Sequence, residues 1–165
     1  MRKLILLSLL FTCFATSAQE VQIDGRLQPL LTDFFEKCKK YNIEVHEKLF
    51  KLQSIDVVNT LTVSENGSTL GMLRRNEQGE VVSIEINWIA LMDPEILKVV
   101  AFHEFGHYFL DYSKHVCDDC GEIMAVVNSS YFEIIRDWDN QLQILFEQSP
   151  VYKRKLGTPI AYRKH

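Results

Sequence analysis

The chain has 165 residues, a length typical of one domain, and its 47% hydrophobic and 24% charged residues are ordinary for a globular protein. Lysine and arginine number 18 against 22 aspartates and glutamates, which gives a formal net charge of −4. A mildly acidic chain lacks the concentrated positive charge of nucleic-acid-binding proteins, so we expect no nucleic acid among its partners.

The N-terminus has the pattern of a secretory signal peptide. Two basic residues precede an apolar run from Leu4 to Phe14, and small residues end at Ala18. The run is shorter than the roughly 20 residues that a membrane-spanning helix needs. We therefore expect residues 1–18 to be removed and residues 19–165 to form one exported domain, periplasmic or extracellular, without stable membrane insertion. A lipoprotein acylated on Cys13 is the alternative.

Local patterns predict an α+β fold in which a small twisted sheet packs on a buried central helix. In the third predicted strand, apolar residues at 82, 84 and 86 alternate with polar residues at 83, 85 and 87, which is typical of a half-buried strand. The expected elements, in chain order, are a helix over about 27–41, strands near 54–62, 69–75 and 81–89, a helix from Pro94 to about Asp111, and a last helix over 131–148.

The helix expected from Pro94 has a clear start and no polar face. Asp93 is a good N-cap, Pro94 suits the first helical position, and Glu95 complements the helix dipole. Apolar residues follow nearly all round the helix, which is the pattern of a helix buried within a protein. Polar groups in such a helix are costly, at about 1–3 kcal/mol each when they lack a partner.

This helix nevertheless carries two histidines and a glutamate, as His103-Glu104-Phe105-Gly106-His107. Residues four apart share one helix face, so both imidazoles can be aimed at one ion. Zinc accepts imidazole nitrogens at about 2.0–2.1 Å in tetrahedral geometry. Glu104 is displaced from that face but can accept a proton from water at the ion, so it is the candidate catalytic base. Gly106 leaves room for another segment of chain to approach.

A catalytic zinc has three protein ligands and one open position, so a third ligand is expected after the helix. Asp111 is excluded because eight helical residues separate it from His103 by about 12 Å. His115 is the first imidazole in the irregular stretch that follows, and we predict it as the third ligand of one catalytic zinc. The alternative is Glu133 on the last predicted helix, with Asp137 four residues later to orient it.

Three cysteines remain after removal of the leader. In an oxidising compartment at least one pair is expected to form a disulfide. Cys117 and Cys120 could pair with each other or through Cys38, and the odd count leaves one thiol over. Together with Asp118 and Asp119, these two cysteines are further alternatives for the third metal ligand.

The stretch from His103 to Met124 resembles the active site of the metzincin-type zinc peptidases. In that pattern two helix histidines are followed by a third histidine and a methionine turn beneath the metal, and His115 and residues 121–124 match these roles here. The resemblance implies a zincin-like fold and one catalytic zinc. The order of elements is also similar to that of small secreted bacterial zincins of unassigned substrate.

This sequence departs from the metzincin pattern at two points. Leu110 stands where the family carries glycine, and His115 comes two residues later than the family's third histidine. No tyrosine directly follows Met124, so Tyr131 is the nearest candidate for a group that stabilises the transition state.

The predicted function is a secreted zinc metallopeptidase that hydrolyses peptide or protein substrates, with Glu104 as general base. One alternative is a zinc-binding but catalytically inactive binding module. Another is a structural protein whose two helix histidines are satisfied by neighbours in the core. As a further hypothesis, the edge of the strand at 81–89 would pair with an extended peptide substrate.

Overall fold

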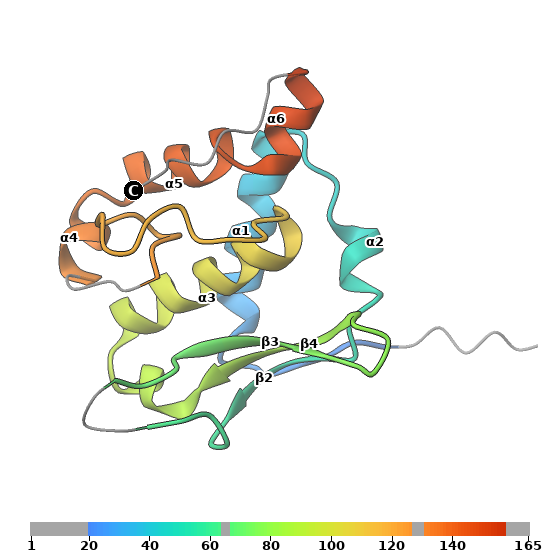
Figure 1. Ribbon diagram of the computed structural model, residues 1–165, viewed down its shortest axis with the longest axis vertical. Helices are drawn as coiled ribbons and strands as arrows, with labels where there is room; N and C mark the ends of the chain where they lie inside the picture. Colours follow the sequence, from blue (N-terminus) through green and yellow to red (C-terminus); the bar gives the residue numbers. More distant parts are fainter. Residues whose placement is uncertain (1–19, 64–66, 127–130, 158–165) are drawn as a thin grey trace, which may run out of the picture.

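The computed structural model describes residues 20–63, 67–126 and 131–157, so the expected signal peptide lies outside the described residues. Within these ranges one four-stranded sheet is combined with six α-helices (Figure 1). The elements, in chain order, are β1 (Gln22–Ile23), α1 (Gln28–Lys40), α2 (His46–Leu49), β2 (Ser54–Val58), β3 (Gly71–Arg75), β4 (Val81–Asn87), the 3-10 helix η1 (Trp88–Met92), α3 (Pro94–Phe109), α4 (Tyr131–Arg136), α5 (Trp138–Glu147) and α6 (Pro150–Leu156). None of the described helices is long and apolar enough to cross a membrane.

The sheet has the order β1-β2-β4-β3, with β1, β2 and β4 parallel and β3 antiparallel to β4. Figure 1 shows α1 and α3 on one face of this sheet, with α5 and α6 beyond α3. The expected combination of α and β structure, with a small sheet against a central helix, is confirmed. β4 occupies the middle of the sheet, since Ile84 pairs with Ile55 on one side and with Leu73 on the other.

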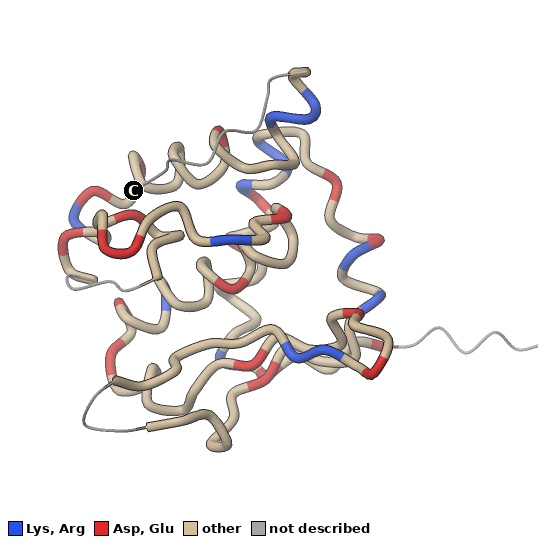
Figure 2. The backbone as a smooth tube through the Cα atoms, in the orientation of Figure 1, with Lys and Arg blue, Asp and Glu red and all other residues tan. Residues whose placement is uncertain are grey.

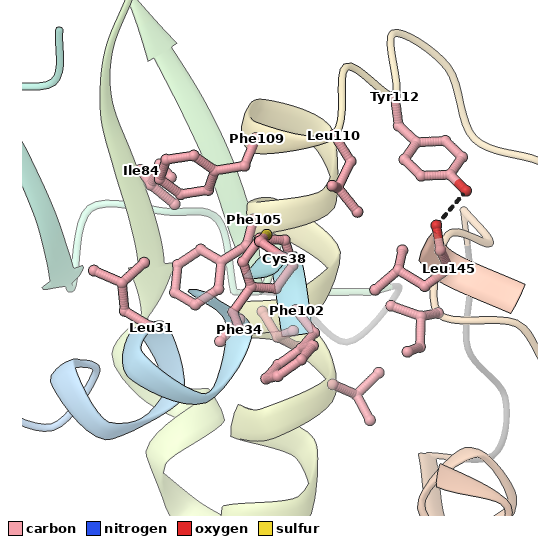
Figure 3. Close-up of a cluster of buried hydrophobic side chains, with 14 of the residues drawn as sticks. Leu31, Phe34, Cys38, Ile84, Phe102, Phe105, Phe109, Leu110, Tyr112 and Leu145 are labelled. Carbon is pink, nitrogen blue, oxygen red and sulfur yellow. Dashed lines mark hydrogen bonds between the residues drawn. The ribbon is translucent and has the colours of Figure 1, made fainter. Parts of the chain in front are cut away.

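The expected start of α3 is confirmed, because Asp93 Oδ1 accepts hydrogen bonds from the backbone N–H groups of Glu95 (2.8 Å) and Ile96 (3.3 Å). Half of the helix's sixteen residues are buried. Its phenylalanines lie around Phe34 of α1, as Figure 3 shows. The ring centroids of Phe102 and Phe105 are 5.3 Å and 5.4 Å from that of Phe34. This aromatic core fixes α3 between the sheet and the C-terminal helices, so the residues on it are held rigidly.

The third predicted strand forms as β4, but the prediction that one of its faces is exposed is wrong. Ser83, Glu85 and Asn87 are all buried, like the isoleucines between them. Arg74 of the neighbouring strand lies over Glu85 and donates two hydrogen bonds to its carboxylate. Asn87 donates to the carbonyl of Thr69 (2.8 Å) and caps η1, which ends the strand two residues early. Both edges of β4 are paired, so the expected strand addition at β4 is wrong as well.

The single last helix expected over 131–148 is divided into α4 and α5 at Asp137, whose backbone leaves the helical conformation (φ −112°, ψ 34°). Four short elements, β1, α2, η1 and α6, were not predicted from the sequence. The strand predicted near 54–62 forms as β2, but it ends at Val58. These differences do not alter the position of α3.

Candidate metal centre

Two imidazoles project from one face of α3 toward a common point. The Nε2 atoms of His103 and His107 are 3.1 Å apart, as the four-residue spacing predicts. His103 is buried more deeply than His107, and burial together with repulsion from His107 lowers the pKa of His103 to about 3. Burial also lowers the pKa of His107. Both rings are therefore neutral near pH 7, which is the form that can bind a metal ion.

The chain reverses directly after α3 and returns to the same point. Leu110 is the C-cap, and Asp111 then takes the left-handed backbone conformation at φ 62°, a conformation that asparagine and aspartate tolerate better than most residues. The Asp111 carboxylate forms ion pairs with Lys48 and Arg154. An aspartate held by two cations thus makes the turn after α3.

The reversal brings His115 to the helix pair. Its Nε2 lies 3.2 Å from that of His103 and 3.3 Å from that of His107. A tetrahedral zinc with bonds of about 2.0–2.1 Å separates its ligand nitrogens by about 3.3–3.4 Å. The three observed separations are close to that value, so the cluster has the dimensions of three corners of a tetrahedron around one ion.

Backbone carbonyls orient the two helix histidines. The Nδ1 of His103 lies 2.7 Å from the carbonyl oxygen of Ile123, and the Nδ1 of His107 lies 2.5 Å from that of Tyr112. A carbonyl only accepts, so each Nδ1 carries the proton and each Nε2 presents a lone pair. The lone pairs of His103 and His107, on nitrogens 3.1 Å apart, repel each other unless a proton or a cation lies between them, and the Nε2 of His115 lies within 3.3 Å of both. The three histidines could therefore hold a metal ion.

Glu104 lies beside this cluster and is almost fully buried, with 6% of its surface exposed. Burial raises the pKa of its carboxyl group to about 8. Its side chain passes directly over Gly71 of β3, where an added Cβ would lie 2.4 Å from Glu104 Oε1. No described side chain forms an ion pair with it, so the carboxylate is available to a group that enters the site.

The loop after His115 is held together by a disulfide and a backbone hydrogen bond. Cys117 and Cys120 form a disulfide, and Cys38 is a buried free thiol, which decides between the pairings that the sequence left open. The backbone N–H of Val116 donates to the carbonyl of Met124 (3.0 Å) and ties the two ends of the loop together.

Met124 is buried directly under α3. A Cβ added at Gly106 would lie 2.7 Å from Met124 Sδ, which confirms that Gly106 admits another segment. The loop is therefore packed against the helix that carries the two histidines.

A hollow of about 550 Å³ opens over the cluster and is lined by the three histidines, Glu104 and residues of β3. Tyr131, the tyrosine singled out in the sequence, also lines it, and burial raises the pKa of its phenol. Glu133, the alternative ligand, lies on the exposed side of α4 and is not part of the histidine cluster.

Sequence reasoning missed three features of the site: the carbonyls of Tyr112 and Ile123 that orient the imidazoles, and the glycine at position 71 that makes space for Glu104. Backbone acceptors leave no signal in a sequence. Gly71 could have been noticed as an isolated glycine within a predicted strand, a pattern that often marks the close approach of another group.

No protein-family model, curated protein or solved structure matches this chain. The resemblance to metzincin-type peptidases therefore stays an expectation carried by residues 103–124. The roles of the residues follow from the chemistry of the site itself, and the activity drawn from them is a proposal.

Proposed function

We propose that this protein is an exported zinc-dependent peptidase in which His103, His107 and His115 bind the ion and Glu104 is the general base. The observation that carries the proposal is the convergence of three imidazole Nε2 atoms, 3.1–3.3 Å apart, beside the buried carboxyl group of Glu104 under an open hollow. The signal-like leader supports export.

The donor set favours zinc. Magnesium and calcium take oxygen ligands, whereas imidazole suits zinc and its first-row neighbours. Three protein ligands with the fourth direction open is the arrangement of catalytic zinc sites, while structural sites have four protein ligands. The nitrogen separations fit tetrahedral geometry, which zinc adopts more readily than copper(II) or nickel(II).

Glu104 fits the role of general base through its position and its surroundings. When bound, zinc supplies Lewis-acid polarisation of the scissile carbonyl and lowers the pKa of water. Glu104 accepts the proton of the attacking water and passes it to the leaving amine, which needs a carboxylate within hydrogen-bond reach of both groups. Burial raises the pKa of Glu104, and no described residue forms an ion pair with it, so a cation bound at the histidines would lower that pKa and favour the carboxylate.

A peptide is the substrate class that the surroundings favour. β3 ends the order β1-β2-β4-β3, so one of its edges has no strand beside it among the described residues. Leu70 accepts a hydrogen bond from Asn87, so by the alternation of an antiparallel ladder the peptide groups of Gly71 and Leu73 point to the open edge. An extended peptide could pair there, one strand beyond the edge predicted from the sequence.

The proposal is tested by Glu104→Gln, which retains the shape of the side chain and removes its basicity. We expect zinc content equal to the parent's and a loss of peptide hydrolysis of at least about 100-fold, the lower range for a general base. Glu133→Gln is the matched control and should retain activity. Hydrolysis by the Glu104→Gln protein at the parent's rate would refute the assigned base. A parent that binds zinc but cleaves no peptide in a degenerate library would instead be a binding module.

A further inference from the structure

A second hollow, of about 700 Å³, lies beside the metal centre. Its walls come from the end of α2, the hairpin of β3 and β4, and the end of α3, which Figure 1 shows on the same side of the molecule. Leu73 and His107 line both this hollow and the one over the histidine cluster. The two hollows are therefore neighbours that meet at Leu73 and His107.

The second hollow carries a positive charge in an acidic protein. Three cations line it, Lys48, Lys51 and Arg75, against two acids, Glu80 and Asp111, so its formal charge is 3 − 2 = +1. The whole chain has a net charge of −4. Figure 2 shows the basic segments of α2 and of the end of β3 on the side of the molecule where this hollow lies. By contrast, among the described residues that line the first hollow, Glu104 is the only aspartate, glutamate, lysine or arginine.

Hydrogen bonds decide which of these charges can meet a ligand. Lys48 Nζ donates to the carbonyls of Tyr108 and Phe109 (3.1 Å each) and pairs with Asp111, so its donors are occupied. Arg154 pairs with the second oxygen of Asp111. The carboxylate of Asp111 thus faces two cations, and the three groups together retain one positive charge.

The remaining acid of the hollow is also engaged. Glu80 accepts a hydrogen bond from the side chain of Asn76 (3.1 Å) within the β3–β4 turn. Arg75 donates one of its N–H groups to the carbonyl of Gly79 (2.7 Å) and keeps its other donors. Lys51 is exposed and has no ion pair with a described residue. Lys51 and Arg75 are therefore the two cations of this hollow whose N–H groups can donate hydrogen bonds to a ligand.

The pleat of β3 sets the order of groups from the first hollow to the second. Alternate residues of a strand share one face, so Gly71, Leu73 and Arg75 follow one another on the side of the sheet that faces α3. Gly71 lies under Glu104, Leu73 lines both hollows and Arg75 lines the second. A peptide paired with this edge would thus run from the catalytic carboxylate toward the two free cations.

We propose that the hollow bounded by Lys51 and Arg75 binds a carboxylate of the peptide substrate, on one side of the scissile bond only. The carboxylate would belong either to an aspartate or glutamate side chain or to the free C-terminus of the peptide. The inference rests on the proposed function for the course of the peptide. It adds a preference for acidic substrates that the metal centre itself does not impose.

The test measures binding apart from turnover. Degenerate hexapeptides, acetylated and amidated, carry glutamate or the isosteric glutamine at one position, and a third set has neutral side chains and a free C-terminal carboxylate. Their affinities for the zinc-loaded Glu104→Gln protein are compared by competition in fluorescence anisotropy. Two exposed cations facing one carboxylate should favour a glutamate peptide over its glutamine match by about fivefold.

A double variant, Lys51→Gln with Arg75→Gln, should abolish this preference. The matched control, Lys39→Gln with Lys40→Gln, removes two exposed charges from α1 and should keep it. Preference for the amidated glutamate set assigns the hollow to a side chain, and preference for the free acid assigns it to the chain end. Equal binding of all three sets, or a preference that both double variants abolish, would overturn the inference.

Cleavage of the same peptides by the zinc-loaded parent separates the two proposals. Cleavage without any preference for a carboxylate would leave the peptidase proposal standing and refute the acidic subsite. Selective binding of carboxylate peptides without cleavage would refute the peptidase proposal and support the subsite.

Discussion

Substitution of Gly71 by alanine should displace the side chain of Glu104, the proposed base, and leave the three histidines in place. A Cβ at this position would lie 2.4, 2.5 and 2.7 Å from Oε1, Cγ and Cδ of Glu104. Ordinary van der Waals contact begins at 3.4 Å, so the side chain must retreat by about 3.4 − 2.4 = 1.0 Å. Backbone atoms of β3 are held by the ladder to β4, which leaves Glu104 as the group that moves.

A displacement of about 1 Å at a reacting group costs roughly 100-fold in rate, or about 2.7 kcal/mol of transition-state stabilisation. The fold itself should not suffer, since alanine in a strand interior is favoured over glycine by about 0.5–1 kcal/mol. We therefore expect kcat/KM to fall about 100-fold while zinc content and the midpoint of thermal unfolding stay near those of the parent.

The assay compares kcat/KM on a peptide that the parent cleaves, with zinc measured on the same samples. Gly25→Ala is the matched control, because nothing lies within 4 Å of a Cβ added there and its φ is not in the left-handed region. A Gly71→Ala protein as active as the parent would refute the assigned position of the base. Loss of zinc from this variant would show that Gly71 supports the ligands and not Glu104.

Two further predictions concern stability and the loop. Arg74 lowers the pKa of Glu85 through its hydrogen bonds, so this pair stabilises the fold above the ordinary pKa of 4.5, and the contribution is lost as pH falls through the lowered value. Urea unfolding should show Arg74→Ala less stable than the parent at pH 7 and equal to it well below pH 4; a constant difference would contradict this. Replacing Cys117 and Cys120 by serine should weaken zinc binding in a competition with a chromogenic chelator, because the disulfide restrains the loop that carries His115; an unchanged affinity would show that packing alone holds the loop.

Features set by local chemistry were predicted well. The start of α3 depends on Asp93 and Pro94, which act within one helical turn, and its burial follows from its own apolar surface. The burial of Glu85 could not be predicted, because Arg74, which covers it, belongs to another strand and the register that brings the two together is not local. The break at Asp137 is equally hidden, since the apolar stripe runs through it.

The site also contains features that could be predicted from local sequence and features that could not. His103 and His107 are positioned by helical spacing alone, so their convergence could be read from the sequence. His115 reaches them only because Asp111 adopts a left-handed conformation between Lys48 and Arg154, two residues from distant parts of the chain. The second hollow likewise depends on residues that are far apart in the chain, and no local sequence pattern predicts that they lie close together.

Zinc per chain, measured by elemental analysis on the protein produced without residues 1–18, beside its His115→Ala and Glu133→Ala variants, tests the proposed three-histidine centre most directly. All three proteins should be folded, and the two variants should be compared at equal metal supply. We predict one zinc in the parent and in Glu133→Ala, and a large loss in His115→Ala. A full zinc content in His115→Ala, or none in the metal-replete parent, would contradict the proposed centre.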